Sequence, residues 1–560
     1  MSIYKWTKFI GVAVLCTAML TACSSVNQGN GDSESNTTET EQTNTDNQSK
    51  TETAAYADQI NKTEVMSISI DVDEEAWKEM LDNASEEQYI SANITINGTT
   101  IENVGIRPKG NSSLRQVASD DTTDRYSFKI KFDEYVKDQT WMGLDKLVVN
   151  NMISDSSYMK EYLSYDIMSY IGVDAPLFAF SNISVNGETW GLYLAVEDID
   201  SGYLARAKND EGELYKPNND DNMGAGGMGG PDGNPFAQGY GGDMQAPKEG
   251  MTPPVGATPP DMNSGTGEEG SNTQAEAGGR GKRGPGGMDG SGNGVSLVYT
   301  DDESSSYSAI FDNAETKTTE EDHQRVIEAL KNLSTGTDLE KYVDVDEVLR
   351  YFAAHTVVVN MDSYTSNMGH NYYLYENDGQ ISMLPWDYNM AFGGFQAGTA
   401  SDVVNLAIDT PLSGVSLEER PILDKLLEVP EYKAKYHEYL QEIVDGYFAD
   451  GKFEEKVQSL NDMIADYVKQ DPTAFVTYDK YETAVTELTK LGTLRAESIQ
   501  GQLDGDIPST TEKQKENADS LIDASSIDLS KLGENNARGG MGMGGSGRRA
   551  AEVNQSQEGK

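Results

Sequence analysis

Residues 360–394 read NMDSYTSNMGHNYYLYENDGQISMLPWDYNMAFGG, and this stretch decides how the chain is interpreted. A predicted helix over 346–359 leads into it, and Asp362 then precedes Asn367 in the form Asp-x4-Asn. The Asn-Asp-Gly turn at 377–379 predicts a tight hairpin. The second strand of that hairpin ends just before Asp387, which follows Asp362 by 25 residues. The predicted order is helix, Asp-x4-Asn loop, hairpin and second acid.

This order matches the chemistry of phosphoryl transfer from a nucleotide. Such a reaction needs one carboxylate to orient or deprotonate the accepting hydroxyl, and a second acid with an amide to hold the metal that bridges the phosphates. Protein kinases supply these groups in the order found here. We therefore predict that Asp362 is the catalytic acid and that Asp387 binds the metal with Asn367.

Each of these assignments has a structural alternative. Asp387 could cap the following turn, Trp386 could simply fill a core, and Asp362 could be a loop acid with no role. His355 and His370 are poor candidates for zinc ligands because no second ligand stands at a usable spacing.

The first half of the chain supplies candidates for nucleotide contacts. The segment KGNSS at 109–113 is predicted to be a turn that lays backbone amides over phosphates, although it has one glycine and a plain turn is an equal alternative. Lys129 or Lys131, on the next predicted strand, would reach the phosphates, and the residues do not decide between them. Glu161, on a predicted helix, would pair with that lysine. Glu197 would mark the hinge that meets the adenine, or simply face solvent. The predicted turn residues of the site are Gly110, Asn111, Ser112 and Ser113.

The predicted fold is α+β, with a β-rich first half and a helical second half. Alternating apolar residues predict strands over 65–73, 90–98, 99–110, 125–132 and 178–197, with Asn-Gly hairpin turns at 97–98 and 186–187. Helices are expected over 74–82 and 155–171. The β-rich part is placed at 64–216 and the helical part, which carries the Asp-x4-Asn segment, at 295–504.

A low-complexity insertion separates the two halves. Residues 217–294 contain one valine and no leucine or isoleucine, so they cannot bury a core. The insertion interrupts one folded unit, because 212–216 before it and 295–302 after it both read as strands. Its methionines suggest copper binding, but their irregular spacing favours a solvated loop. Residues 505–560 are predicted to be a disordered tail.

The amino terminus is typical of an exported lipoprotein. Residues 1–22 combine two lysines, a short apolar run and a small-residue cleavage site, which predicts a signal peptide rather than a membrane span. The following Cys23 completes a sequence similar to a bacterial lipobox, so we expect Cys23 to be lipidated and to attach the chain to the outer face of the membrane. The alternative is ordinary cleavage with a free Cys23. Residues 23–63 are polar and are predicted to be a disordered tether.

The charge balance restricts the partners. The formal net charge is −50, which repels nucleic-acid phosphates, so no nucleic-acid partner is expected. Any phosphate ligand needs local lysines or a metal to offset this field.

Several segments together resemble one family, the spore coat protein H (CotH) kinases. They are IRPKGNSSLR, RYSFKIKF, SYMKEYLSYDIMSYIGVDAP, VNGETWGLYLAVEDID, GELYK, NYYLY and PWDYNMAFGG, and they cover roughly residues 65–400 outside the insertion. The resemblance implies an atypical protein-kinase-like fold with two lobes, which binds ATP with Mg²⁺ or Mn²⁺ and phosphorylates serine or threonine of secreted or coat proteins. It implies that Asp362 takes the place of the catalytic acid and Asp387 that of the metal-binding acid, with Asn367 and Asn371 as nearby candidates.

The sequence departs from the family pattern at two positions, where an arginine is expected in place of Lys109 and another polar residue is frequent in place of Glu161.

Three hypotheses follow for the function. The first is a surface-anchored protein kinase, and the second a kinase-like scaffold for surface or coat assembly that has lost catalysis. The third is a glycoside hydrolase or carbohydrate-binding protein, since paired carboxylates and aromatic residues also suit sugars.

Overall fold

A computed structural model describes residues 54–218 and 294–533. The predicted signal peptide, Cys23, most of the predicted tether, nearly all of the insertion and the end of the tail lie outside the described residues. Across the described ranges, no helix has the length and apolar character needed to cross a membrane.

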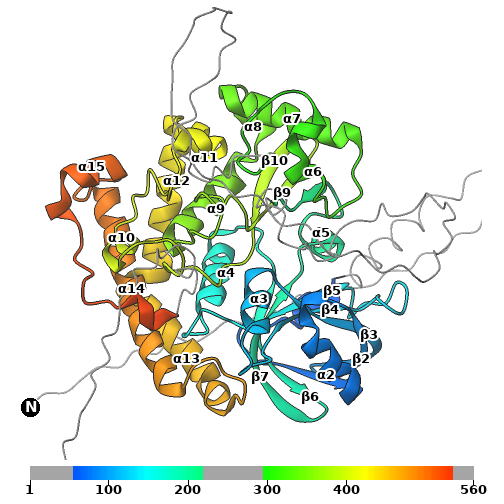
Figure 1. Ribbon diagram of the computed structural model, residues 1–560. Helices are drawn as coiled ribbons and strands as arrows, with labels where there is room; N and C mark the ends of the chain where they lie inside the picture. Colours follow the sequence, from blue (N-terminus) through cyan, green and yellow to red (C-terminus); the bar gives the residue numbers. More distant parts are fainter. Residues whose placement is uncertain (1–53, 219–293, 534–560) are drawn as a thin grey trace, which may run out of the picture. The chain divides into compact units, whose positions relative to one another are not determined.

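Seven strands form a closed barrel in the first half of the chain, drawn in blue to cyan in Figure 1. Their order around the barrel is β1-β2-β3-β4-β5-β7-β6, and the parallel pairing of β1 with β6 closes it. The strands are β1 (Met66–Val72), β2 (Ile90–Ile96), β3 (Thr99–Lys109), β4 (Ser127–Lys131), β5 (Lys146–Asn150), β6 (Phe178–Val185) and β7 (Glu188–Glu197).

The alternation of apolar residues explains how the barrel fills its interior. On β4 the side chains of Phe128 and Ile130 are fully buried, while Lys129 and Lys131, which alternate with them, lie on the other face and are partly exposed. The hairpins turn where Asn-Gly pairs are predicted, and Asn97 and Asn186 adopt the positive φ angles that such turns require. These strand and turn predictions are confirmed.

A second, three-stranded sheet joins the chain on the two sides of the insertion. Its order is β10-β9-β8, with β8 (Glu213–Tyr215) before the insertion and β9 (Tyr372–Asn377) and β10 (Gln380–Pro385) after it. The prediction of a strand over 295–302 is wrong. Residues 295 and 296 instead offer backbone carbonyls to the buried hydroxyls of Tyr372, at 2.8 Å, and Tyr364, at 3.0 Å.

The second half is helical, which together with the barrel makes the fold α+β as predicted (Figure 1). Its helices are α6 (Ser308–Phe311), α7 (Glu320–Thr335), α8 (Leu339–Tyr342), α9 (Val345–Val358), α10 (Ala400–Val404), α11 (Pro421–Leu427), α12 (Pro430–Ile443), α13 (Lys452–Gln470), α14 (Tyr478–Asp504) and α15 (Thr511–Glu516). The first half adds α2 (Glu74–Asp82), α3 (Ser112–Ala118), α4 (Lys160–Ile171) and α5 (Ser201–Ala207). The predicted helix over 155–171 therefore starts at residue 160.

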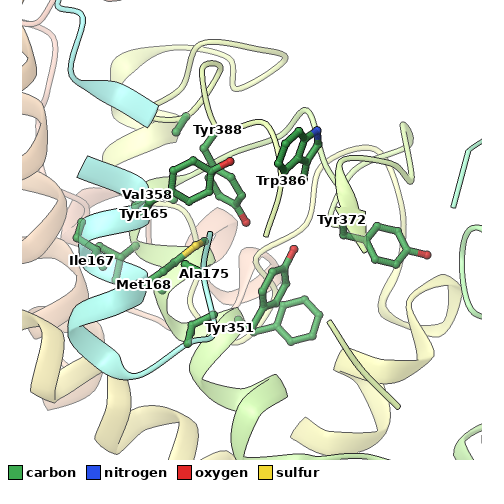
Figure 2. Close-up of a cluster of buried hydrophobic side chains, with 14 of the residues drawn as sticks. Tyr165, Ile167, Met168, Ala175, Tyr351, Val358, Tyr372, Trp386 and Tyr388 are labelled. Carbon is green, nitrogen blue, oxygen red and sulfur yellow. The ribbon is translucent and has the colours of Figure 1, made fainter. Parts of the chain in front are cut away.

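The central helix is α4, because it packs on both β6 and α9. All of its side chains except those of Ser169 and Tyr170 are buried, so little of it faces solvent. Tyr165 and Met168 of α4 lie in one apolar cluster with Tyr351 and Val358 of α9 (Figure 2). The residues that α4 carries are thus fixed relative to the Asp-x4-Asn loop, which follows α9 directly.

Two predicted boundaries of disorder are wrong. Residues 54–63 are folded, and Tyr56 is fully buried. The tail is folded as far as residue 533, where Leu532 is buried and its carbonyl accepts a hydrogen bond of 3.0 Å from the backbone amide of Ser156. Both segments are polar, and a few buried apolar side chains are enough to hold each of them on the folded core.

Candidate active site

Asp387 lies directly after β10, at a sharp change of chain direction. Its φ angle is +59°, and its backbone amide donates to the hydroxyl of Tyr165 at 3.1 Å. The rings of Tyr165 and Tyr388 pack with centroids 5.8 Å apart (Figure 2). Trp386, the residue before Asp387, is buried as well. The aromatic residues around Asp387 therefore fix its backbone. The burial of Trp386 agrees with the prediction that it fills a core.

The carboxylate of Asp387 is partly buried and makes no hydrogen bond or ion pair with any residue that the structure describes. Desolvation raises the pKa of Asp387, Lys109 opposes this shift, and the negative charge of Asp362 adds to it. A carboxylate that is desolvated and unpaired is unfavourable in a protein on its own. The alternative that this acid caps a turn is not supported, because its side chain accepts no backbone hydrogen bond.

Asp362 lies in the loop that follows α9 and is held by its neighbours in the loop. The Nε2 of His370 lies 2.7 Å from its Oδ1. The amide nitrogen of Asn371 donates to its backbone carbonyl at 2.8 Å and to its Oδ2 at 3.2 Å. The charges of Asp362 and Asp387 interact, so the two acids predicted from the sequence do lie near one another.

The two candidate amides occupy different places. Asn371 contacts Asp362 through its nitrogen, which leaves the amide oxygen available at the acid. Asn367 has a buried Oδ1 with no hydrogen-bond partner among the described residues, and it lies next to Gly414 instead. Of the two amides, Asn371 is the one that the structure brings to Asp362.

His355 links the two acidic segments through hydrogen bonds. Its Nδ1 lies 2.8 Å from the hydroxyl of Tyr388, and its Nε2 lies 2.9 Å from Oγ1 of Thr365. Burial lowers the pKa of His355 to about 3, so the ring is neutral at physiological pH. In the described parts of the chain, no three His, Cys, Asp or Glu side chains converge on one point as a metal cluster would require.

Glu161 of α4 approaches the same site from the barrel side. Its carboxylate accepts two hydrogen bonds, of 2.9 and 3.1 Å, from the amide of Asn150 at the end of β5. The Oδ1 of Asn150 in turn accepts from Nζ of Lys109 at 3.3 Å. Burial, with Asp387 nearby, raises the pKa of Glu161 to about 7. The lysine associated with Glu161 is therefore Lys109, and Asn150 bridges the two side chains by hydrogen bonds.

The predicted pairing of Glu161 with Lys129 or Lys131 is wrong. Lys129 forms an ion pair of 2.9 Å with Asp198, just after β7. Lys131 pairs with Glu134 at 2.8 Å, in the connection that follows its own strand. Register explains this, because Lys129 lies opposite Arg107 on β3, two residues before Lys109 on that strand.

The segment at 109–113 is a strand end followed by a helix, not a turn between strands. Gly110 has a φ angle of +122°, and α3 begins at Ser112 after Asn111. A Cβ atom at position 110 would lie 2.5 Å from Oγ of Ser113, so glycine is required there. The predicted amide loop over phosphates remains a prediction.

Glu197 does not face solvent and is not available to a ligand. Its carboxylate is fully buried and is bound by Arg206 at 2.6 and 2.8 Å, by the backbone amide of Leu177 at 2.9 Å and by the hydroxyl of Tyr56. Its side chain ties the end of β7 to α5 and to the amino-terminal segment.

The sequence interpretation also missed residues. Lys146 pairs with Asp200 at 3.2 Å, and Lys216 lies after β8 with its Nζ 5.0 Å from the centre of the Trp386 ring. With Lys109 and Lys129 they make four lysines that interact with one another or with the acids around the site. A signal for them was present, since each lysine stands at the end of a strand or within one in a chain of strongly negative charge.

The chain belongs to the CotH kinase family, which is a family of atypical kinases. The family model described as CotH kinase protein matches residues 106–499, which is more than half of the chain. A particular relative is the inner spore coat protein H of Bacillus subtilis (strain 168), which is 22% identical over 348 residues, covering 60% of this chain and 73% of the relative.

The state of Glu161 gives the first testable prediction. A buried carboxyl whose pKa rises from 4.5 to about 7 contributes stability that is complete below pH 4.5 and is lost as the pH rises through 7. Glu161→Gln removes this titration. We expect the variant to gain stability relative to the native chain between pH 5 and pH 8, by about 2 kcal/mol. Urea unfolding at several pH values measures this, and a difference that does not change with pH would contradict it.

Proposed function

We propose that this protein is a surface-anchored protein kinase that transfers the γ-phosphate of ATP to serine or threonine of secreted or spore coat proteins. Membership of the CotH kinase family supports use of ATP and a protein substrate. The single observation that carries the proposal is the unpaired carboxylate of Asp387, which lies near Asp362 at the end of a rigid hairpin.

The side chains fit a hard divalent cation such as Mg²⁺ or Mn²⁺. Such ions prefer carboxylate and amide oxygens, and Asp387 offers a carboxylate with no partner among the described residues while Asn371 offers an amide oxygen beside Asp362. Asp387 would hold the ion with Asn371. When bound, the ion would neutralise charge on the phosphates.

The remaining residues have roles that their contacts suggest. Asp362 would accept the proton of the attacking hydroxyl, and its contact with His370 would hold the carboxylate in place. Lys109 would contact phosphate, oriented by the hydrogen bonds that link it through Asn150 to Glu161. This chain of contacts is intact, which favours catalysis over a scaffold that has lost it.

The location of the protein is part of the proposal. The lipobox-like sequence ending at Cys23 supports anchoring on the outer face of the membrane, and membrane fractionation of a Cys23→Ser variant tests this. Protein substrates rich in serine and exported by the same cell would then be within reach of the site.

The decisive experiment is ATP binding by the full-length chain, measured by calorimetry with Mg²⁺ and with EDTA. We expect Mg²⁺ to tighten binding about tenfold or more in the native chain, and Asp387→Asn to lose this gain because it removes the carboxylate. Asp378→Asn is the matched control, since it changes an exposed acid in the turn of the same hairpin. Binding that depends on Mg²⁺ equally in native and Asp387→Asn chains would contradict the assignment.

A further inference from the structure

Among the lysines around the candidate site, Lys216 is the least compensated. It follows β8 directly, and its backbone amide donates to the carbonyl of Asn313 at 2.9 Å, which fixes the chain at this point. Its Nζ lies 5.0 Å from the ring centre of Trp386 and 5.2 Å from that of Tyr373. No carboxylate or hydrogen-bond acceptor in the described residues binds this ammonium group.

The other lysines around the site differ in this respect. Lys129 and Lys146 each have a carboxylate within 3.2 Å or less. Lys109 has the oxygen of Asn150, and its Nζ lies 5.7 Å from the ring centre of Trp386. Lys109 and Lys216 thus both approach the same indole ring, next to Asp387.

This arrangement is unfavourable without a ligand. Burial lowers the pKa of Lys216, the acids Glu315 and Asp198 oppose that shift, and the positive charges of Lys129 and Lys109 add to it. Contact with aromatic rings compensates only part of the desolvation of an ammonium group. A chain with a formal net charge of −50 has many carboxylates, yet none of the described ones pairs with Lys216.

We propose that Lys216 and Lys109, held on Trp386, bind the polyphosphate part of a nucleotide, and that Lys216 contacts the phosphates beyond the first. The inference rests on the proposed function and assigns Lys216 a role in that site. An oligophosphate is the ligand class that fits, because it brings several anionic oxygens to two nearby ammonium groups and to the cation that Asp387 would hold. Lys216 therefore distinguishes a nucleoside triphosphate from a monophosphate.

The test compares the dissociation constants of AMP, ADP, ATP and inorganic pyrophosphate with Mg²⁺, for the native full-length chain and for Lys216→Met. We expect Lys216→Met to weaken ATP and pyrophosphate by about 10- to 100-fold and to leave AMP unchanged. Lys216→Arg should retain most of the ATP affinity because it keeps the charge. Lys331→Met is the matched control, since Lys331 also lies over a tyrosine ring and pairs with Asp302 at the surface.

The outcomes separate this inference from the proposed function. Native binding that is tighter for ATP than for AMP, with the same preference in Lys216→Met, overturns the role of Lys216 and leaves the kinase proposal standing. Equal losses for AMP and ATP also overturn it, because they indicate general damage to the site. A native chain that binds none of these ligands overturns both. Thermal unfolding checks the fold, and we expect Lys216→Met to be at least as stable as the native chain.

Discussion

Asp362→Asn is expected to reduce phosphoryl transfer by about 100- to 10,000-fold while ATP binding stays intact. The asparagine keeps the shape of the side chain, and its oxygen can still accept from Nε2 of His370. It loses the 3.2 Å hydrogen bond from Asn371, but Asn371 still donates to the backbone carbonyl at 2.8 Å, so the loop should keep its conformation. It cannot accept a proton from the attacking hydroxyl. The measurement is transfer of radiolabelled phosphate to the chain itself and to serine-rich acceptors, alongside calorimetric ATP binding.

Asp302→Asn is the control for this substitution, because it changes a surface acid that pairs with Lys331 and accepts a hydrogen bond from the hydroxyl of Tyr299. If Asp362→Asn transfers phosphate at the native rate, Asp362 takes no part in the chemistry. If neither the native chain nor Asp302→Asn transfers phosphate although both bind ATP, the scaffold hypothesis gains support. Surface assembly that survives Asp362→Asn but not deletion of residues 219–293 would support it further.

The strands and hairpins of the barrel could be predicted because their signals are local. Alternation along β4 depends only on side-chain period, and an Asn-Gly pair fixes a turn by its own backbone preference. The proximity of Asp362 and Asp387 was also predictable, because the two acids lie at neighbouring ends of one helix, loop and hairpin unit. Local order along the chain determined these features.

The lysine next to Glu161 could not be predicted, because it depends on non-local register. Residues 110–126 connect β3 to β4, and nothing in them specifies that Lys109 stands opposite Ser127. Lys129 lies opposite Arg107, two residues from Lys109 along β3, and two residues along a strand span about 7 Å. This distance is enough for Lys109 to lie near Glu161 while Lys129 pairs with Asp198. The burial of Glu197 depends similarly on Tyr56, which lies 141 residues away.

The ends of the folded part were misjudged for a different reason. Residues 505–533 show no helical or strand periodicity, and their buried side chains, such as Ile507, Ile527 and Leu532, are widely spaced. Composition alone therefore indicated disorder, although each apolar residue finds a place on a core built by other segments.

Arg125→Met is expected to lower the free energy of unfolding by about 3–5 kcal/mol, a large effect for one side chain. Arg125 and Asp471 are both fully buried and pair at 2.8 Å, which joins the segment before β4 to the connection between α13 and α14. Nε of Arg125 also donates to the carbonyl of Asn151 at 3.2 Å. Gly191 permits this contact, because a Cβ there would lie 2.5 Å from Nη1 of Arg125. Removing the guanidinium leaves the carboxylate of Asp471 buried without its cation.

The double variant Arg125→Met with Asp471→Asn separates the stabilisation that the ion pair contributes from the destabilisation caused by leaving one buried charge unpaired. We expect it to be more stable than Arg125→Met alone, because no buried charge remains unpaired. Lys78→Met is the control, since Lys78 forms an exposed pair with Asp82 on the single helix α2 and should lose much less stability. Urea unfolding measures all four chains. If Arg125→Met and Lys78→Met lose equal stability, the buried pair is not a principal contact between the barrel and the helical half.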